Sequence, residues 1–384
     1  MNFGYYMPTR IFFGEGSVKK LARAKLPVGR GLIITGGTST TKLGYVDKVA
    51  SALLEGGHDT IVYNNVQPNP TIEGVRECVR LARENACTFV VGLGGGSSID
   101  TAKAAAVMAT NEGDLWDYVF GGTGKAQRIP NPALPIVAVT TTAGTGTEAD
   151  PFAVITNGDE KIGMGWDMTF PAISIVDPDF MTTVPAKLTA YQGFDALFHA
   201  CEGYIAISAN PISEMFSLKS IELLGKYLPL AVTHGDDKNA RAQVALANTL
   251  AGFVETLSSC TSEHAIEHAL SAYHPELPHG AGLIMLSRAY FTVFADTCKE
   301  KFIDMARAMG KTDAADPMDF VATLIELQKA CGVDALAMSD YTIDAENFGK
   351  YADNAFANMG MLFRMDTKQL TREDVIAILK DSYR

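Results

Sequence analysis

Short apolar runs rich in β-branched residues recur through the first half of the chain, with amphipathic segments between them. Such runs occupy residues 31–35, 59–63, 88–93, 135–140 and 172–177. Each is bounded by turn-forming residues and has the length of a buried strand. Residues 71–85, TIEGVRECVRLAREN, instead repeat apolar side chains at helical spacing. Strands that alternate with helices in this way predict a parallel α/β sheet.

Beyond about Pro185 the strand pattern gives way to successive helical segments. They begin at Leu188 and are interrupted near Pro211, Gly235, Pro278 and Gly310. A chain of 384 residues is also too long for one ordinary hydrophobic core. We therefore expect an α/β domain over residues 1–185, followed by an all-helical domain over residues 186–384.

The composition argues against several classes of protein. The chain is 47% hydrophobic and 20% charged, with a net charge of -12 and no basic cluster that could bind a nucleic acid. No apolar stretch is long enough to cross a bilayer, and the first ten residues lack the layout of a signal peptide. The six cysteines show no CxxC spacing. We expect a cytoplasmic protein with reduced thiols and with neither a nucleic acid nor a membrane as a partner.

Two glycine-rich loops directly follow predicted strands. GGGSSIDTAK begins at Gly94 and opens a helix whose free amide groups would favour an anion. TTTAGTGTE begins at Thr140 and offers several hydroxyl donors. One glycine cluster is often only a turn, but two such loops at the ends of parallel strands indicate a cofactor across the carboxyl edge of the sheet. A third loop, TGGTSTTKLG at 35–44, lacks the common GxGxxG fingerprint.

Histidine is concentrated in one segment, because four of the seven histidines lie between His264 and His279. His264 and His268 are four residues apart, as are Asp195 and His199 upstream, so each pair would share one face of a helix. A single histidine is usually an ordinary surface residue. A carboxylate with several imidazoles from separate segments, however, suits a first-row divalent cation.

The spacing alone does not choose the partner of His264. Either His268 or His279 would complete a metal site, and His279 follows Pro278 at the expected start of a helix. His274 is a weaker candidate because it lies in the loop SAYHPELP, whose direction the sequence does not define.

Taken together, the motifs resemble those of the iron-containing (group III) alcohol dehydrogenases. The likeness covers nearly the whole chain and rests on GGGSSIDTAK, TTAGTGTE, GFDALFHACE and H-x3-H…LPHG, in that order. It implies an N-terminal Rossmann-like dinucleotide-binding domain with a parallel sheet and a C-terminal helical metal-binding domain, as in the dehydroquinate synthase-like fold. The active site would lie in the cleft between the two domains.

By motif match, the resemblance places four metal ligands at Asp195, His199, His264 and His279. His268 matches a histidine near the nicotinamide, which makes it the catalytic candidate, suited to relaying a proton. The implied cofactor-binding positions in the two loops and beyond are Gly95, Gly96, Ser97, Asp100, Thr140, Thr142, Thr145 and Lys161.

The choice of cofactor depends on the loop after the first predicted strand. Many NAD-preferring relatives have an aspartate there, which binds the ribose hydroxyls and repels a 2′-phosphate. This chain has Gly36, Gly37, Thr38 and Ser39, whose amides and hydroxyls could hold the phosphate. We therefore expect NADP(H), with NAD(H) as the second choice. For the metal we expect Fe²⁺, although mixed nitrogen and oxygen ligands also accept Zn²⁺.

The implied reaction is hydride transfer between a primary alcohol and a nicotinamide, with the metal as a Lewis acid. Asp150 and Glu255 add carboxylates near the expected pocket and argue against simple apolar alcohols as the preferred substrates. Two other functions stay open, namely a glycerol dehydrogenase-like or dehydroquinate synthase-like enzyme and a non-catalytic nucleotide-binding protein. The resemblance also implies a homo-oligomer, a dimer or larger.

Overall fold

A parallel sheet of six strands forms the centre of the first half of the molecule. The computed structural model describes residues 2–384. The strand order is β1-β8-β5-β4-β2-β3, and every neighbouring pair is parallel. The strands span Arg10–Phe13 (β1), Arg30–Gly36 (β2), Asp59–Val66 (β3), Cys87–Gly94 (β4), Ile136–Thr140 (β5) and Ile173–Val176 (β8). All five predicted strands are confirmed.

Three strands were not predicted. β1 has only four residues at the edge of the sheet, too few for a clear pattern. β6 (Phe152–Asn157) and β7 (Glu160–Gly165) form a separate antiparallel hairpin. Its turn places Gly158 at φ 63, and the tight turn between two alternating segments was the signal available in the sequence.

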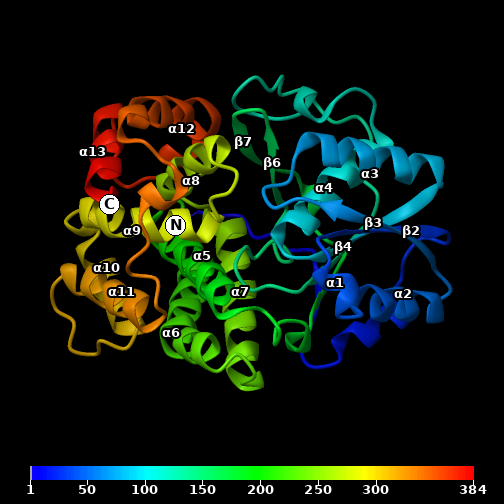
Figure 1. Ribbon diagram of the computed structural model, residues 1–384, viewed down its shortest axis with the longest axis horizontal. Helices are drawn as coiled ribbons and strands as arrows, with labels where there is room; N and C mark the ends of the chain where they lie inside the picture. Colours follow the sequence, from blue (N-terminus) through cyan, green and yellow to red (C-terminus); the bar gives the residue numbers. More distant parts are fainter. Residues whose placement is uncertain (1) are drawn as a thin grey trace.

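Helices cover both faces of the main sheet (Figure 1). The 3-10 helix η1 (Ser17–Arg23) and α2 (Tyr45–Glu55) pack on one face. The short helix α1 (Ser39–Lys42) precedes α2 in the chain. α3 (Ile72–Glu84) and α4 (Gly96–Thr110) pack on the other. α3 confirms the helix predicted at 71–85, and the Thr71 side chain caps it by accepting from the Gly74 amide.

The order of the strands creates a crevice at the carboxyl edge of the sheet. The chain passes from β2 to the outer strand β3 and then returns to β4 on the other side of β2. The loops that follow β2 and β4 therefore lead to helices on opposite faces of the sheet. Open α/β sheets bind ligands at such a switch point.

The second half of the chain is helical, and its helices surround α5. The helices are α5 (Ala186–Ile205), α6 (Pro211–Thr233), α7 (Lys238–Ser258), α8 (Ser262–Tyr273), α9 (His279–Ala295), α10 (Lys299–Ala308), α11 (Met318–Ala330), α12 (Phe348–Phe363) and α13 (Arg372–Ser382). α5 is buried along most of its length, because α6, α7 and α9 pack around it. Polar residues on α5 are therefore held in the interior.

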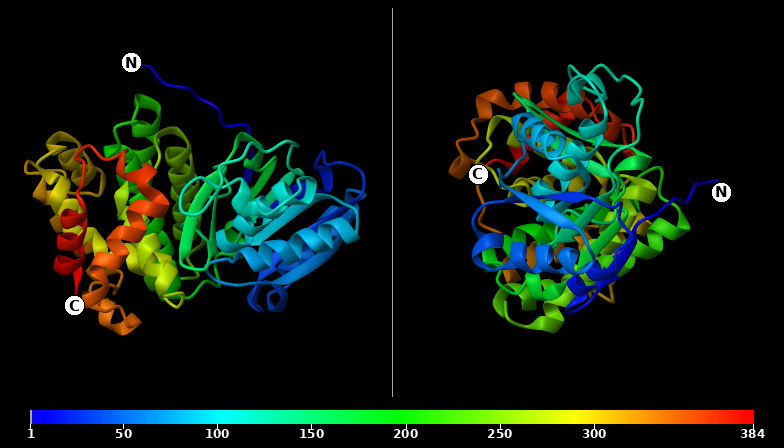
Figure 2. Two further views of the ribbon diagram at one scale, coloured as in Figure 1. Left: turned by 90° about the horizontal axis from the view of Figure 1, so that it is seen from above. Right: turned by 90° about the vertical axis from the view of Figure 1, so that its right-hand side faces the viewer.

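The two halves lie side by side and share buried polar contacts (Figure 2). The Glu148 carboxylate accepts hydrogen bonds from Asn248 at 2.9 Å and from Thr249 at 2.7 Å. The Gly146 amide donates to the Asn248 side chain at 2.9 Å. The predicted fold class is confirmed, whereas a domain boundary at residues 185 and 186 stays a prediction. Within the described residues, no helix has both the length and the apolar character required to traverse a membrane.

Candidate active site

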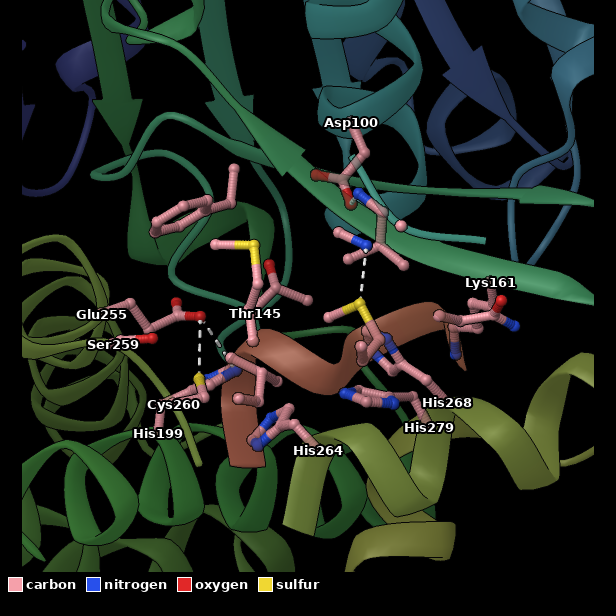
Figure 3. Close-up of a pocket in the computed structure, with 18 of the residues that line it drawn as sticks. Asp100, Thr145, Lys161, His199, Glu255, Ser259, Cys260, His264, His268 and His279 are labelled. Carbon is pink, nitrogen blue, oxygen red and sulfur yellow. Dashed lines mark hydrogen bonds and ion pairs between the residues drawn. The ribbon is translucent and has the colours of Figure 1, made fainter. Parts of the chain in front are cut away.

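A cavity of about 590 Å³ lies between the two halves. The start of α4 and the hairpin β6–β7 line it from the α/β half. The helical half contributes α5, α7, α8, α9 and α12. Four of the imidazoles singled out in the sequence, those of His199, His264, His268 and His279, reach this cavity (Figure 3).

Three imidazoles surround one buried carboxylate at the floor of the cavity. The Asp195 Oδ1 atom lies 3.7 Å from the Nε2 atom of His199, 3.6 Å from that of His264 and 3.5 Å from that of His279. The Asp195 side chain is 5% exposed. Although burial disfavours ionisation, the neighbouring imidazoles hold the pKa of Asp195 below its ordinary value. The carboxylate is therefore charged in the interior.

The other nitrogen of each imidazole is already bonded, which leaves Nε2 free to face the centre. The His199 Nδ1 atom lies 3.2 Å from the Gly144 carbonyl oxygen, to which it can donate. Nδ1 of His264 bonds the Glu202 carboxylate, and Nδ1 of His279 bonds the Glu267 carboxylate. This second layer of acceptors is the arrangement that orients histidine ligands of metals.

The atoms without hydrogen-bond partners around Asp195 suit the binding of a divalent cation. Within the described residues, the Asp195 Oδ1 and His264 Nε2 atoms are buried and have no hydrogen-bond partner. Burial also lowers the pKa of His199 to about 3, so that its imidazole is neutral, the form that binds metals. One carboxylate oxygen and three imidazole nitrogens form a donor set that suits iron or zinc.

The structure separates the remaining histidines of the segment. His268 lines the cavity, and its ring centroid lies 5.3 Å from that of His279. Burial and the nearby Lys161 ammonium lower the pKa of His268, which keeps this imidazole neutral at pH 7. His274 is directed elsewhere, since its Nε2 atom bonds the Tyr351 hydroxyl at 2.8 Å outside the cavity.

Two functional carboxylates were missed in the sequence. Glu202 and Glu267 are both fully buried behind the histidines that they bond. The signal for Glu202 was its position three residues after His199 on the same face of α5. Glu267 lies within the H-x3-H motif, directly before His268, but the spacing does not show which histidine it contacts.

The two predicted cofactor loops meet at the carboxyl edge of the sheet. A Cβ atom built on Gly95 would lie 3.0 Å from the Thr142 hydroxyl, and one on Gly96 would lie 2.6 Å from the Thr145 side chain. Glycine is therefore required for the close approach. Gly96, Ser97 and Thr145 line the cavity, whereas Gly95, Thr140 and Thr142 do not.

Asp100 and Lys103 of α4 fix the base of the hairpin. Asp100 lines the cavity and accepts hydrogen bonds from the Thr147 hydroxyl at 2.8 Å and the Val154 amide at 3.0 Å. Burial raises the pKa of Asp100 to about 6. The buried Lys103 ammonium contacts the Asp150 carboxylate at 3.1 Å and thereby balances its charge.

Lys161 connects the hairpin to the metal-ligand candidates. Its ammonium lies 2.7 Å from the Ser271 hydroxyl and 3.5 Å from the Glu267 carboxylate. Glu267 thus lies between a lysine from the α/β half and His279 from the helical half.

Gly36 ends β2 and Gly37 to Ser39 follow it, at the same edge of the sheet as the two cofactor loops, but none of them lines the cavity. A Cβ atom on Gly36 would lie 2.6 Å from the Val66 carbonyl oxygen. Packing against β3 is thus one reason for glycine at this position, whichever cofactor binds. Thr38 and Ser39 are exposed.

Comparison with known proteins identifies the family. The family model for "Iron-containing alcohol dehydrogenase" matches residues 8–178, and the model for "Fe-containing alcohol dehydrogenase family, C-terminal" matches residues 189–383. The chain belongs to the iron-containing alcohol dehydrogenase family.

Individual relatives agree with this assignment. The chain is 32% identical to alcohol dehydrogenase 4 of Saccharomyces cerevisiae, over 99% of this chain and 98% of the relative. It is 37% identical to the 1,3-propanediol dehydrogenase of Citrobacter freundii, over 83% and 82% of the two chains. The structure of an archaeal halo-thermophilic alcohol dehydrogenase from a Red Sea brine pool superposes with a TM-score of 0.95 at 31% identity, covering 100% of this chain and 99% of that one.

The family assignment establishes the class of enzyme. The protein is an oxidoreductase that interconverts alcohols and aldehydes, as the motifs predicted. The two alternatives considered from the sequence are not favoured, namely a glycerol dehydrogenase-like or dehydroquinate synthase-like enzyme and a non-catalytic nucleotide-binding protein.

Replacing the carboxylate behind His279 tests the candidate metal centre. Glu267→Gln removes the negative charge that orients His279, so we expect the affinity for a divalent cation to fall roughly 10- to 100-fold. Competition with a chelator measures this affinity directly. The matched control is Glu276→Gln in the adjoining loop, where the side chain is 53% exposed and the affinity should stay unchanged. Equal affinities in both variants would show that Glu267 does not orient a ligand.

Proposed function

We propose that Asp195, His199, His264 and His279 hold a divalent cation, Fe²⁺ by expectation, and that the adjoining cleft binds NADP(H). The reaction is the interconversion of primary alcohols and aldehydes by hydride transfer. The observation that carries the proposal is the convergence of three Nε2 atoms on the Asp195 Oδ1 atom, at 3.5 to 3.7 Å.

The cofactor position is supported by the crevice at the end of the sheet. The amides at the start of α4 favour a pyrophosphate, and Gly96 and Ser97 line the cavity there. Lys161 is the cation nearest the metal-ligand candidates and can contact the cofactor from the hairpin side. A dinucleotide along this path would present its nicotinamide near His268.

The chain's own residues supply binding, orientation and proton transfer. When bound, the divalent cation polarises the substrate oxygen as a Lewis acid. Phe152, Met359 and Leu362 give the cavity an apolar lining that limits the access of water. The Nδ1 atom of His268 is buried without a partner, so the imidazole is available to relay the substrate's hydroxyl proton towards solvent.

Reconstitution with different metals tests the central proposal. The metal-stripped protein should not oxidise NADPH with an aldehyde, and anaerobic Fe²⁺ should restore turnover more fully than Zn²⁺. Absorbance of the reduced cofactor at saturating aldehyde gives the rate, and parallel assays with NADH give the cofactor preference. Asp195→Asn should bind neither metal tightly. Full turnover by that variant, or by the stripped protein, would contradict the proposal.

A single substitution tests the choice of cofactor. Thr38→Asp places a carboxylate in the exposed loop after β2, where it would repel a 2′-phosphate. We expect the Kd for NADPH to rise about 10-fold, with little change for NADH. The matched control is Thr38→Asn, which has a similar shape without the charge. Cofactor fluorescence measures both constants, and an equal effect on NADPH and NADH would reject a 2′-phosphate site at this loop.

The role of His268 is tested through the pH dependence of turnover. His268→Gln removes the titratable ring, so we expect kcat to fall roughly 100-fold and its pH profile to change shape. His274→Gln serves as the control, because that ring bonds Tyr351 outside the cavity. A lower kcat with an unchanged pH profile would assign His268 to positioning instead of proton transfer.

A further inference from the structure

Glu255 is a carboxylate on the cavity wall without a balancing cation. It belongs to the last turn of α7, and its Oε1 atom lies 3.4 Å from the His199 Nε2 atom. The Cys260 thiol donates to the same oxygen at 3.4 Å. Oε2 is buried and has no hydrogen-bond partner within the described residues. Glu255 thus lines the cavity with one oxygen that no donor in the described part of the chain satisfies.

Asp150 and Glu255, the two carboxylates that the sequence placed near the pocket, differ in whether a cation is paired with them. Asp150 is paired with the Lys103 ammonium and also accepts the Phe152 amide at 2.6 Å. For Glu255, no lysine or arginine in residues 2–384 makes an ion pair. Lys161, a cation that also lines the cavity, is engaged by Glu267 and Ser271. A carboxylate removed from water without a partner is costly, so a bound group that supplies a donor would be favoured.

The neighbours of Glu255 make one wall of the cavity polar. Ser259 and Cys260 follow α7 directly and line the cavity beside Glu255 (Figure 3). Ser259 has φ 76, a strained conformation for a residue with a side chain. Much of the remaining lining is apolar, including Phe152, Met361 and Leu362. The cavity therefore offers a polar end and an apolar passage.

We propose that Glu255 forms a subsite for a second hydrogen-bond donor of the substrate. The substrate class is a short alcohol or aldehyde that carries a hydroxyl or ammonium group a few bonds from the reacting carbon. Glu255 and Asp195 flank the same His199 nitrogen, so the donor would bind close to the reacting oxygen. The subsite rests on the proposed metal centre and selects among its substrates.

A panel of four alcohols of equal length tests the subsite. n-Propanol, 1,3-propanediol, 3-amino-1-propanol and 3-hydroxypropanoate share three carbons and a primary hydroxyl, and the carbon at the other end is a methyl, a hydroxymethyl, an ammoniomethyl or a carboxylate group. With metal-loaded enzyme and saturating cofactor, kcat/KM for the hydroxyl or the ammonium substrate should exceed that for n-propanol by about 10- to 100-fold. The carboxylate substrate should be the poorest, because its distal group offers Glu255 no hydrogen-bond donor.

Two substitutions separate charge from hydrogen bonding. Glu255→Leu should remove the preference, with the kcat/KM values for n-propanol and the diol becoming similar. Glu255→Gln keeps an acceptor but no charge, so it should retain most of a preference for the diol and lose most of a preference for the ammonium substrate. Glu326→Gln, exposed on α11, is the control and should behave as the wild type.

Metal affinity provides a second readout that does not depend on turnover. Chelator competition should give the same affinity for the wild type and for Glu255→Gln. A large loss of affinity would make Glu255 a metal ligand and overturn the subsite. The unfolding midpoint of Glu255→Leu will show whether this variant is folded. If it is folded and keeps the wild-type ratios of kcat/KM among the four substrates, the subsite is rejected. If wild-type enzyme oxidises none of the four alcohols while the metal binds, the proposed function has failed before the subsite is tested.

Discussion

The convergence of one buried carboxylate and three imidazoles on a single point is the constraint on which the rest of this site depends. The Oδ1 atom of Asp195 lies 3.5 to 3.7 Å from the Nε2 atoms of His199, His264 and His279. Each of those rings is held by an acceptor at its other nitrogen. The donor set is thus oriented by the protein itself. Orientation before binding is what allows a site to favour one geometry of a cation.

The position of this site between two halves of different architecture has consequences for catalysis. The parallel sheet supplies a crevice at its carboxyl edge, where a dinucleotide can be bound by amides. The helical half supplies the charged and imidazole groups from buried helices. Glu267 contacts both parts, since it bonds His279 and pairs with Lys161 of the hairpin. A change in the position of Lys161 would therefore alter the position of Glu267 and, through it, the orientation of His279.

The carboxylates around the cavity show that formal charge alone does not define a role. Asp150 is balanced by Lys103 and ties the hairpin to α4. Glu202 and Glu267 orient histidines. Glu255 has neither a cation nor a full set of donors and faces the cavity. The same chemical group is thus paired with a cation, bonded to an imidazole or left unpaired beside the cavity, according to its position in the fold.

The sequence by itself determined the fold class, five of the six strands of the main sheet, the glycine loops and the residue types of the candidate site. These features depend on short-range patterns, such as apolar periodicity and the spacing of Asp195 with His199 on one helix. The sequence alone left open whether His268 or His279 joins His264, and it missed Glu202 and Glu267 as their partners. Only the tertiary structure places Asp195 beside rings from α8 and α9, and only it pairs Asp150 with Lys103 while leaving Glu255 unpaired. Those contacts join residues far apart in the chain, and their geometry is set by how helices pack, which no local pattern encodes.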